Sequence, residues 1–376
     1  MTADGRSTMG NMSRLREAVE QSEFDAVIAI SPENVRYAGD VFISSQVWAR
    51  DRLALVVWSK GREPVFILCN VEEGYVRENS WITDIRSYVE FKTSPAYMLA
   101  DLLEEMNLGR GQIGIETDML VLRYYRELME RLPNLKLGGC QDLFARVRML
   151  KTPREIEVIA RGFRGTEQAL HDTFTSVTIG ETEKSLSNRL ADAIMRQGAD
   201  SISINHINAG PNTGYPHATA SDYKVQKGDI VKADAGGFYS EYYSNVGRTA
   251  KVGKPNEEDR SIWRRLRAIH HEIISMLRPG ALGRDLFGKA VQLHEQAGLP
   301  FPYAHNGHGI GLNIHERPII SPIEDIPYAP NMLSTVETRV RWPGKVGYHM
   351  EDLVLITESG PVVLSDRFDN EEILVI

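Results

Sequence analysis

The alternation of apolar and polar segments in the first half of the chain predicts a small α/β domain. Apolar runs predict strands at residues 24–30, 52–59, 64–70 and 112–117, and amphipathic periodicity predicts helices at 12–21 and 121–132. The polar segment 60–63 reads as a turn between two of these strands. We therefore expect strands and helices to alternate up to about residue 145.

A helix-start signal separates this half from the next. Thr152 can act as an N-cap, Pro153 falls at the first helical position, and Glu155 follows Thr152 by three residues. We place the domain boundary just before this helix, with an N-terminal domain of residues 1–147 and a C-terminal domain of residues 148–376. In the second domain the pattern predicts helices at 183–197, 257–277 and 283–297, and strands at 203–208, 229–235, 333–340 and 348–357.

Composition limits the classes of function. The 376 residues suit two domains, and 42% hydrophobic with 25% charged residues is ordinary for a globular protein. The net charge of -8 argues against nucleic acid as a partner, and no apolar run is long enough to span a membrane. The N-terminal segment lacks the apolar region of a signal peptide. Two cysteines, Cys69 and Cys140, fit a reducing cytoplasm and offer no cysteine metal motif.

Titratable residues in unusual positions point to a site in the second half. Asp234, Glu337 and Glu351 lie within apolar, strand-like runs, where a carboxylate is costly unless it is paired or bound to a cation. An ion pair with Arg339 or Arg341 is the alternative for Glu337. Six histidines stand out in the same half: His206, His217, His305, His308, His315 and His349. Three acids with a histidine favour a site for manganese, iron, cobalt or zinc, although any one histidine could merely cap a loop.

His308 lies in a glycine-rich segment. Gly307 and Gly309 flank it and allow its ring to approach a ligand without crowding. His315 follows seven residues later, which is not the helical spacing of a zinc-binding pair, so the segment alone does not define a site.

Together these residues resemble the M24, or pita-bread, family of methionine and Xaa-Pro aminopeptidases, prolidase and creatinase. The resemblance covers nearly the whole chain and rests on ordered segments: SPENVRYAGD, MLKTPREIEVI, YPHATASDYKVQKGDIVKADAGG, SNVGRT, GHGIGLNIHERP and MEDLVLIT. It implies an α/β (α+β) architecture with an N-terminal creatinase-like α/β domain and a C-terminal pita-bread catalytic domain. It also implies a homodimer, in which Trp48, Arg50 and Arg52 could reach the partner; for Trp48, anchoring its own loop is the alternative.

The resemblance assigns roles to individual residues. The implied metal ligands are Asp234, His308, Glu337 and Glu351, with Asn245 at the position of a second, bridging aspartate. His217 matches the histidine that handles protons at the scissile bond. His315 matches the histidine that contacts the substrate or the tetrahedral intermediate. Glu337 is also a candidate general base.

Departures from the family pattern affect the metal and the substrate. Asn245 carries no charge and cannot bridge two divalent ions as a carboxylate does, so we expect one metal ion or none. An engineered Asp-to-Asn substitution is the alternative origin of this residue. His349 stands where peptidases of the family often carry arginine. Arg339 and Arg341 share a strand face with Glu337, so one of them could bind a substrate carboxylate; surface ion pairs are the alternative. The expected substrate-binding residues are Arg339, Arg341, His349 and Tyr215.

Three functions follow from this pattern. The first is a metal-dependent hydrolase that cleaves an amide or other C–N bond of a small substrate or dipeptide, similar to Xaa-Pro peptidases. The second is a metal-independent C–N hydrolase similar to creatinase or ectoine hydrolase, which the missing charge at Asn245 favours. The third is a non-catalytic binding protein on the same fold, which the acidic charge and the retained His217 and His315 disfavour.

Overall fold

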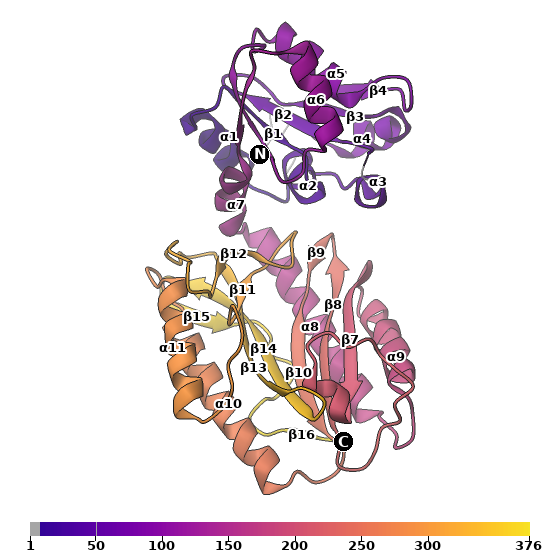
Figure 1. The fold of residues 1–376 in the computed structure, drawn as a ribbon, viewed down its shortest axis with the longest axis vertical. Helices are drawn as coiled ribbons and strands as arrows, with labels where there is room; N and C mark the ends of the chain where they lie inside the picture. The colour runs from indigo at the N-terminus through magenta and orange to yellow at the C-terminus, as the bar shows by residue number, and fades with distance from the viewer. Residues whose placement is uncertain (1–7, 50) are drawn as a thin grey trace. The chain divides into compact units, whose positions relative to one another are not determined.

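The computed structural model describes residues 8–49 and 51–376, so Arg50 lies outside the described residues. The chain divides into two compact units, Met1–Arg148 and Met149–Ile376. Figure 1 shows both units, each built around its own sheets. None of the helices among the described residues has the length and apolar character needed to span a membrane.

The first unit is a six-stranded sheet flanked by helices. Its strand order is β4-β3-β2-β1-β5-β6, and β1 pairs antiparallel with β2 but parallel with β5. The strands are β1 (Ala26–Ala29), β2 (Leu55–Ser59), β3 (Val65–Cys69), β4 (Asp84–Tyr88), β5 (Gln112–Ile115) and β6 (Lys136–Gly139). The helices are α1 (Met12–Gln21), α2 (Pro32–Gly39), α3 (Ser44–Trp48), η1 (Asn70–Glu72), α4 (Glu73–Asn79), α5 (Pro95–Glu105), α6 (Leu122–Arg131) and α7 (Gln141–Met149).

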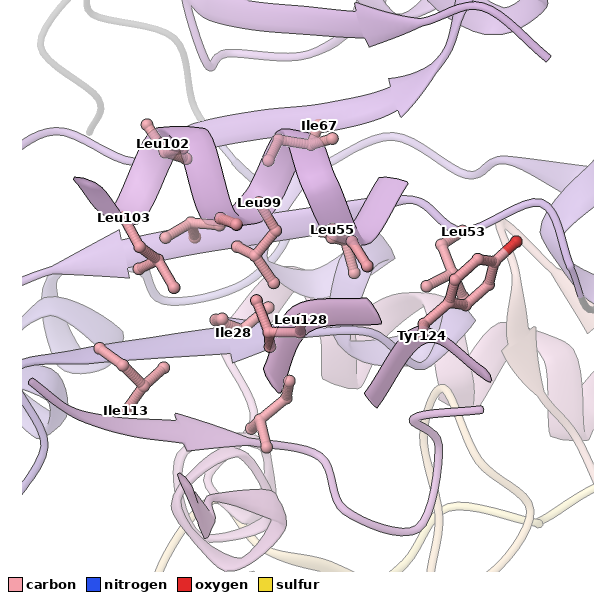
Figure 2. Packing of buried hydrophobic residues seen from close by; sticks show 14 of the residues in the cluster. Ile28, Leu53, Leu55, Ile67, Leu99, Leu102, Leu103, Ile113, Tyr124 and Leu128 are labelled. Atoms are coloured by element: carbon pink, nitrogen blue, oxygen red, sulfur yellow. The ribbon is translucent and has the colours of Figure 1, made fainter. Parts of the chain in front are cut away.

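Two helices close the core of this unit, as Figure 2 shows. Leu99, Leu102 and Leu103 of α5 and Leu128 of α6 pack with buried side chains of the sheet, such as Ile28. Burial of one such leucine stabilises the folded state by about 1.5–3 kcal/mol relative to exposure. Both cysteines of the chain are buried and free in this unit.

The second unit begins with the helix that the capping pattern predicted. Thr152 and Glu155 form both hydrogen bonds of a capping box at the start of α8 (Pro153–Thr175). The other helices are α9 (Glu183–Arg196), η2 (Gly210–Gly214), α10 (Glu257–Met276) and α11 (Gly283–Gln296). The strands are β7 (Ser201–Ala209), β8 (Ile230–Tyr239), β9 (Tyr242–Tyr243), β10 (Val246–Lys251), β11 (His308–Gly309), β12 (Glu316–Ile319), β13 (Leu333–Trp342), β14 (Val346–Thr357), β15 (Gly360–Val363) and β16 (Leu374–Val375).

Two sheets meet along β14 in this unit. One sheet has the order β16-β10-β8-β7, with β9 paired to β8, and the other has the order β13-β14-β15. Helices α8 and α9 pack on the first sheet and α10 packs on the second, while β14 contacts both β10 and β8 (Figure 1). Side chains on β8, β13 and β14 are thereby brought to one place, which is where the predicted acids lie.

Candidate metal and active site

The three predicted acids lie on neighbouring strands and are all buried. Asp234 is on β8, Glu337 on β13 and Glu351 on β14, with exposed fractions of 5%, 8% and 0%. The antiparallel pairing of β13 and β14 sets Glu337 opposite Glu351 and Arg339 opposite His349. Alternation along each strand therefore brings these four side chains to the same face.

Positive and imidazole groups surround Glu337. Arg339 Nη1 lies 2.5 Å from Glu337 Oε2, and His349 Nε2 lies 3.1 Å from Glu337 Oε1. Burial would raise the pKa of Glu337, but Arg339 and His349 outweigh it and hold this pKa well below its usual range. The ion pair that we considered as the alternative for Glu337 is thus present, and it involves Arg339.

Glu351 has a different environment. Asn245 Nδ2 donates a hydrogen bond of 2.5 Å to Glu351 Oε2, while Glu351 Oε1 has no hydrogen-bond partner within the described part of the chain. Burial, and then repulsion from Glu337 and Asp234, raise the pKa of Glu351 well above its usual range. A cation placed among these carboxylates would relieve that repulsion.

The donor set fits a divalent metal ion. One ligand atom each from Asp234, Glu337 and His349 can be chosen so that all three lie within 4.8 Å of one another. Asp234 Oδ1 is buried and lacks a hydrogen-bond partner among residues 8–49 and 51–376. Buried oxygens without partners are costly unless a cation binds them, and mixed carboxylate and imidazole donors suit manganese, iron, cobalt or zinc.

His308 is oriented as a ligand would be. Its Nδ1 lies 2.9 Å from the carbonyl of Gly309, which can only accept, so Nδ1 carries the proton. Nε2 is left with its lone pair and lies 3.8 Å from Glu351 Oε1. Burial lowers the pKa of His308 to about 3, which keeps the ring neutral.

The other predicted residues are distributed around these acids. The ring of His315 lies 4.3 Å from that of His308, and the exposed His217 lies 5.1 Å from His206, measured between ring centroids. The whole side chain of Arg339 is buried. The Nε atom of Arg341 is also buried, and it has no hydrogen-bond partner in the described residues. Tyr215 is 45% exposed, and its carbonyl accepts a hydrogen bond of 2.6 Å from Lys232 Nζ.

Lys232 is a residue that the sequence analysis missed. It is fully buried on β8 two residues before Asp234, so the two side chains share a strand face. Burial, and then the nearby Arg341, lower the pKa of Lys232 to about 7. A lysine two positions before a predicted metal carboxylate, inside an apolar run, was the signal that could have identified it.

Tyr303 was also missed. Its ring centroid lies 4.4 Å from Arg339 Cζ and 5.5 Å from Arg341 Cζ, so it packs beside both guanidinium groups. Its neighbours come from another segment of the chain, and no local pattern in the sequence distinguishes it.

Comparison with known proteins accounts for this arrangement. Residues 157–358 match metallopeptidase family M24, and residues 12–150 match the creatinase/prolidase N-terminal domain. The chain belongs to metallopeptidase family M24. The family and the fold that the sequence predicted are thereby confirmed.

M24 relatives of this chain carry names that indicate peptidase activity. It is 26% identical over 361 residues to the Xaa-Pro dipeptidase of Lactobacillus helveticus, covering 93% of this chain and 95% of the relative. It is 31% identical over 221 residues to the Xaa-Pro dipeptidase of Pyrococcus furiosus, covering 58% of this chain and 64% of the relative. A recombinant prolidase from Thermococcus sibiricus superimposes with a TM-score of 0.88 at 21% identity, covering 98% of this chain and 100% of that chain, which shows the shared fold.

Proposed function

We propose that this M24 protein hydrolyses dipeptides of the Xaa-Pro type with the help of one bound divalent metal ion. The observation that carries the proposal is the buried cluster of Asp234, Glu337 and Glu351, which contains oxygens without hydrogen-bond partners within the described residues. The names of the M24 relatives supply the substrate class. Manganese, iron, cobalt and zinc all suit these donors.

Three residues of this chain would act on the water and the substrate beside the metal ion. A metal ion bound here would polarise the scissile carbonyl and lower the pKa of the attacking water. Glu337, held by Arg339 at 2.5 Å, would accept a proton from that water. His217 would donate a proton to the leaving nitrogen, and His315 would contact the substrate beside His308.

Arg341 is the better of the two candidate arginines for binding the substrate carboxylate. Arg339 already contacts Glu337 Oε2, and it donates to the carbonyls of Glu337 and His305. Arg341 has no ion-pair partner in the part of the chain that the structure describes, and its Nε is buried without a hydrogen bond. A guanidinium without an ion-pair partner can bind a carboxylate through two parallel hydrogen bonds.

Hydrolysis assays with matched substrates test the function. We expect Xaa-Pro dipeptides to be cleaved after manganese, iron, cobalt or zinc is supplied, and Arg341→Gln to raise KM for them about 10- to 100-fold through loss of a charge-assisted contact. The same substitution should leave KM unchanged for Xaa-Pro amides, which lack the carboxylate, and Arg341→Lys should retain part of the effect. No cleavage with any of these metals, together with metal-free hydrolysis of creatine-like or cyclic amidine substrates, would contradict the proposal.

We also propose that the protein is a cytoplasmic homodimer. Trp48 is 70% exposed on α3, where a partner subunit could cover it. Arg52 is less suited to that role because its Nη2 is held by Glu90 at 2.7 Å within the same unit.

A further inference from the structure

His349 lies inside the acid cluster rather than at its edge. Its side chain is fully buried, with Nε2 3.1 Å from Glu337 Oε1 and Nδ1 4.0 Å from Asp234 Oδ2. The ring therefore places its two nitrogens toward carboxylates from two different strands. An open substrate pocket would give such a ring contact with solvent, and His349 has none.

Contacts with β10 fix the backbone of His349 and leave room for its ring. The backbone N–H of His349 donates to Thr249 Oγ1 at 2.8 Å, and Thr249 Oγ1 donates to the carbonyl of His349 at 2.9 Å. On β10, a Cβ at Gly247 would lie only 2.6 Å from His349 Cε1, so the ring occupies space that a larger residue would fill. Gly247 pairs with Asp234 in the sheet, which sets the ring beside that carboxylate.

Asn245 limits the oxygens that Glu351 can offer to a metal ion. The hydrogen bond from Asn245 Nδ2 occupies Glu351 Oε2, which a carboxylate at this position would leave free. In Glu337, Arg339 contacts Oε2, and the other oxygen, Oε1, faces His349. Asp234, Glu337 and His349 each offer one donor atom such that all three atoms lie within 4.8 Å of one another.

We propose that His349 is a metal ligand, and that Asp234, Glu337 and His349 together bind one divalent transition-metal ion. The imidazole supplies a donor in a site where Asn245 has removed a carboxylate. Two oxygens and one imidazole nitrogen favour manganese, iron, cobalt or zinc over magnesium or calcium, which prefer oxygen alone. This inference rests on the metal-dependent function proposed above and adds a ligand to its site.

Binding of Co²⁺ in the absence of substrate tests the ligand directly. We expect His349→Gln to weaken Co²⁺ binding at least about tenfold in equilibrium dialysis and to change the visible absorption of the bound ion. Loss of a group that only orients a ligand already weakens metal binding about 10- to 100-fold, and loss of the ligand itself should weaken it at least as much. His294→Gln is the matched control, because His294 is equally buried but lies on α11 and bonds to the carbonyl of Ala290. It should leave affinity and spectrum unchanged.

Two further variants separate this ligand set from others. Gly247→Ala keeps every metal donor but forces the His349 ring to move, so it should also weaken Co²⁺ binding. This variant tests the ligand even where His349→Gln fails to fold. Folded His349→Gln with normal affinity and spectrum, alongside a His308→Gln variant that loses the ion, would overturn the proposal. Wild-type protein that binds no Co²⁺ would overturn it as well. Loss of Xaa-Pro hydrolysis with intact Co²⁺ binding would count against the proposed function alone.

Discussion

At the scale of single residues, Asn245 shows how one atom changes a site. The family resemblance implies a carboxylate at this position, and the amide instead donates a hydrogen bond to Glu351 at 2.5 Å. A carboxylate there would repel Glu351 unless a cation lay between them, whereas the amide stabilises it without one. We expected His349 to bind substrate, and its full burial between Asp234 and Glu337 is the reason for the metal-binding role proposed above.

His217 provides a residue-scale prediction that separates proton transfer from metal binding. His217→Gln should lower kcat about 10²- to 10⁴-fold, because a positioned acid or base contributes by this factor. Metal affinity should not change, since the exposed ring lies beside His206 rather than among the buried carboxylates. Steady-state kinetics and equilibrium dialysis on the same preparation measure both quantities.

A surface histidine serves as the control for this variant. His171→Gln, on α8 with a side chain that is 45% exposed, should leave kcat unchanged. A normal kcat in His217→Gln, or a loss of metal in it, would show that the histidine does not act as proposed.

At the scale of elements, a buried ionic network joins the strands and helices beneath the site. Arg248 on β10 is fully buried, and its Nη2 lies 2.7 Å from Asp352 Oδ1 and 2.5 Å from Glu167 Oε1. His270 on α10 adds a contact of 2.8 Å to Asp352 Oδ2. Arg248 Nη1 also donates to the carbonyl of Glu351, so the network fixes the backbone of one residue of the buried acid cluster.

Removal of Arg248 should destabilise the C-terminal unit. Arg248→Ala should lower the free energy of unfolding of the C-terminal unit by about 3–5 kcal/mol, because two buried carboxylates lose their partner. Lys184→Ala removes an exposed pair with Asp222 and should change it by less than about 1 kcal/mol. Urea unfolding followed by tryptophan fluorescence compares the two, and equal stabilities would contradict this role for the network.

Elements with strong local signals were predictable from the sequence. The capping box at Thr152 and Glu155 was confirmed at the start of α8, and the expected helix at 183–197 corresponds to α9, Glu183–Arg196. The sequence also indicated the acids, because a carboxylate inside an apolar run is unusual. It could not indicate that Asn245 bonds to Glu351, since 106 residues separate them and the contact depends on how β10 and β14 meet. Lys232 lies in the same apolar run as Asp234, so the sequence held a signal for it, but its contact with the carbonyl of Tyr215 depends on the fold.

At the scale of the whole molecule, the proposed dimer gives a prediction about the first unit. We expect the protein to have twice the chain mass in light scattering, and Trp48→Ala to shift it toward the monomer because an exposed aromatic anchor is lost. Phe91→Ala is the control, since Phe91 is 93% exposed in the same unit and carries no assigned contact role. A wild-type monomer, or a dimer that only Phe91→Ala disrupts, would contradict the assignment.

Metal content of the wild type and of Asn245→Asp shows whether Asn245 limits the site to one metal ion. After loading with Mn²⁺ and gel filtration, mass spectrometry should find about one ion per chain in the wild type and about two in Asn245→Asp, which regains a bridging carboxylate. Asn205→Asp is the control: Asn205 pairs with Ala235 and bonds to Ser187, so its added carboxylate lies on the opposite face of the sheet from Asp234. Two ions in the wild type, or none, would contradict a site in which Asn245 leaves room for a single metal.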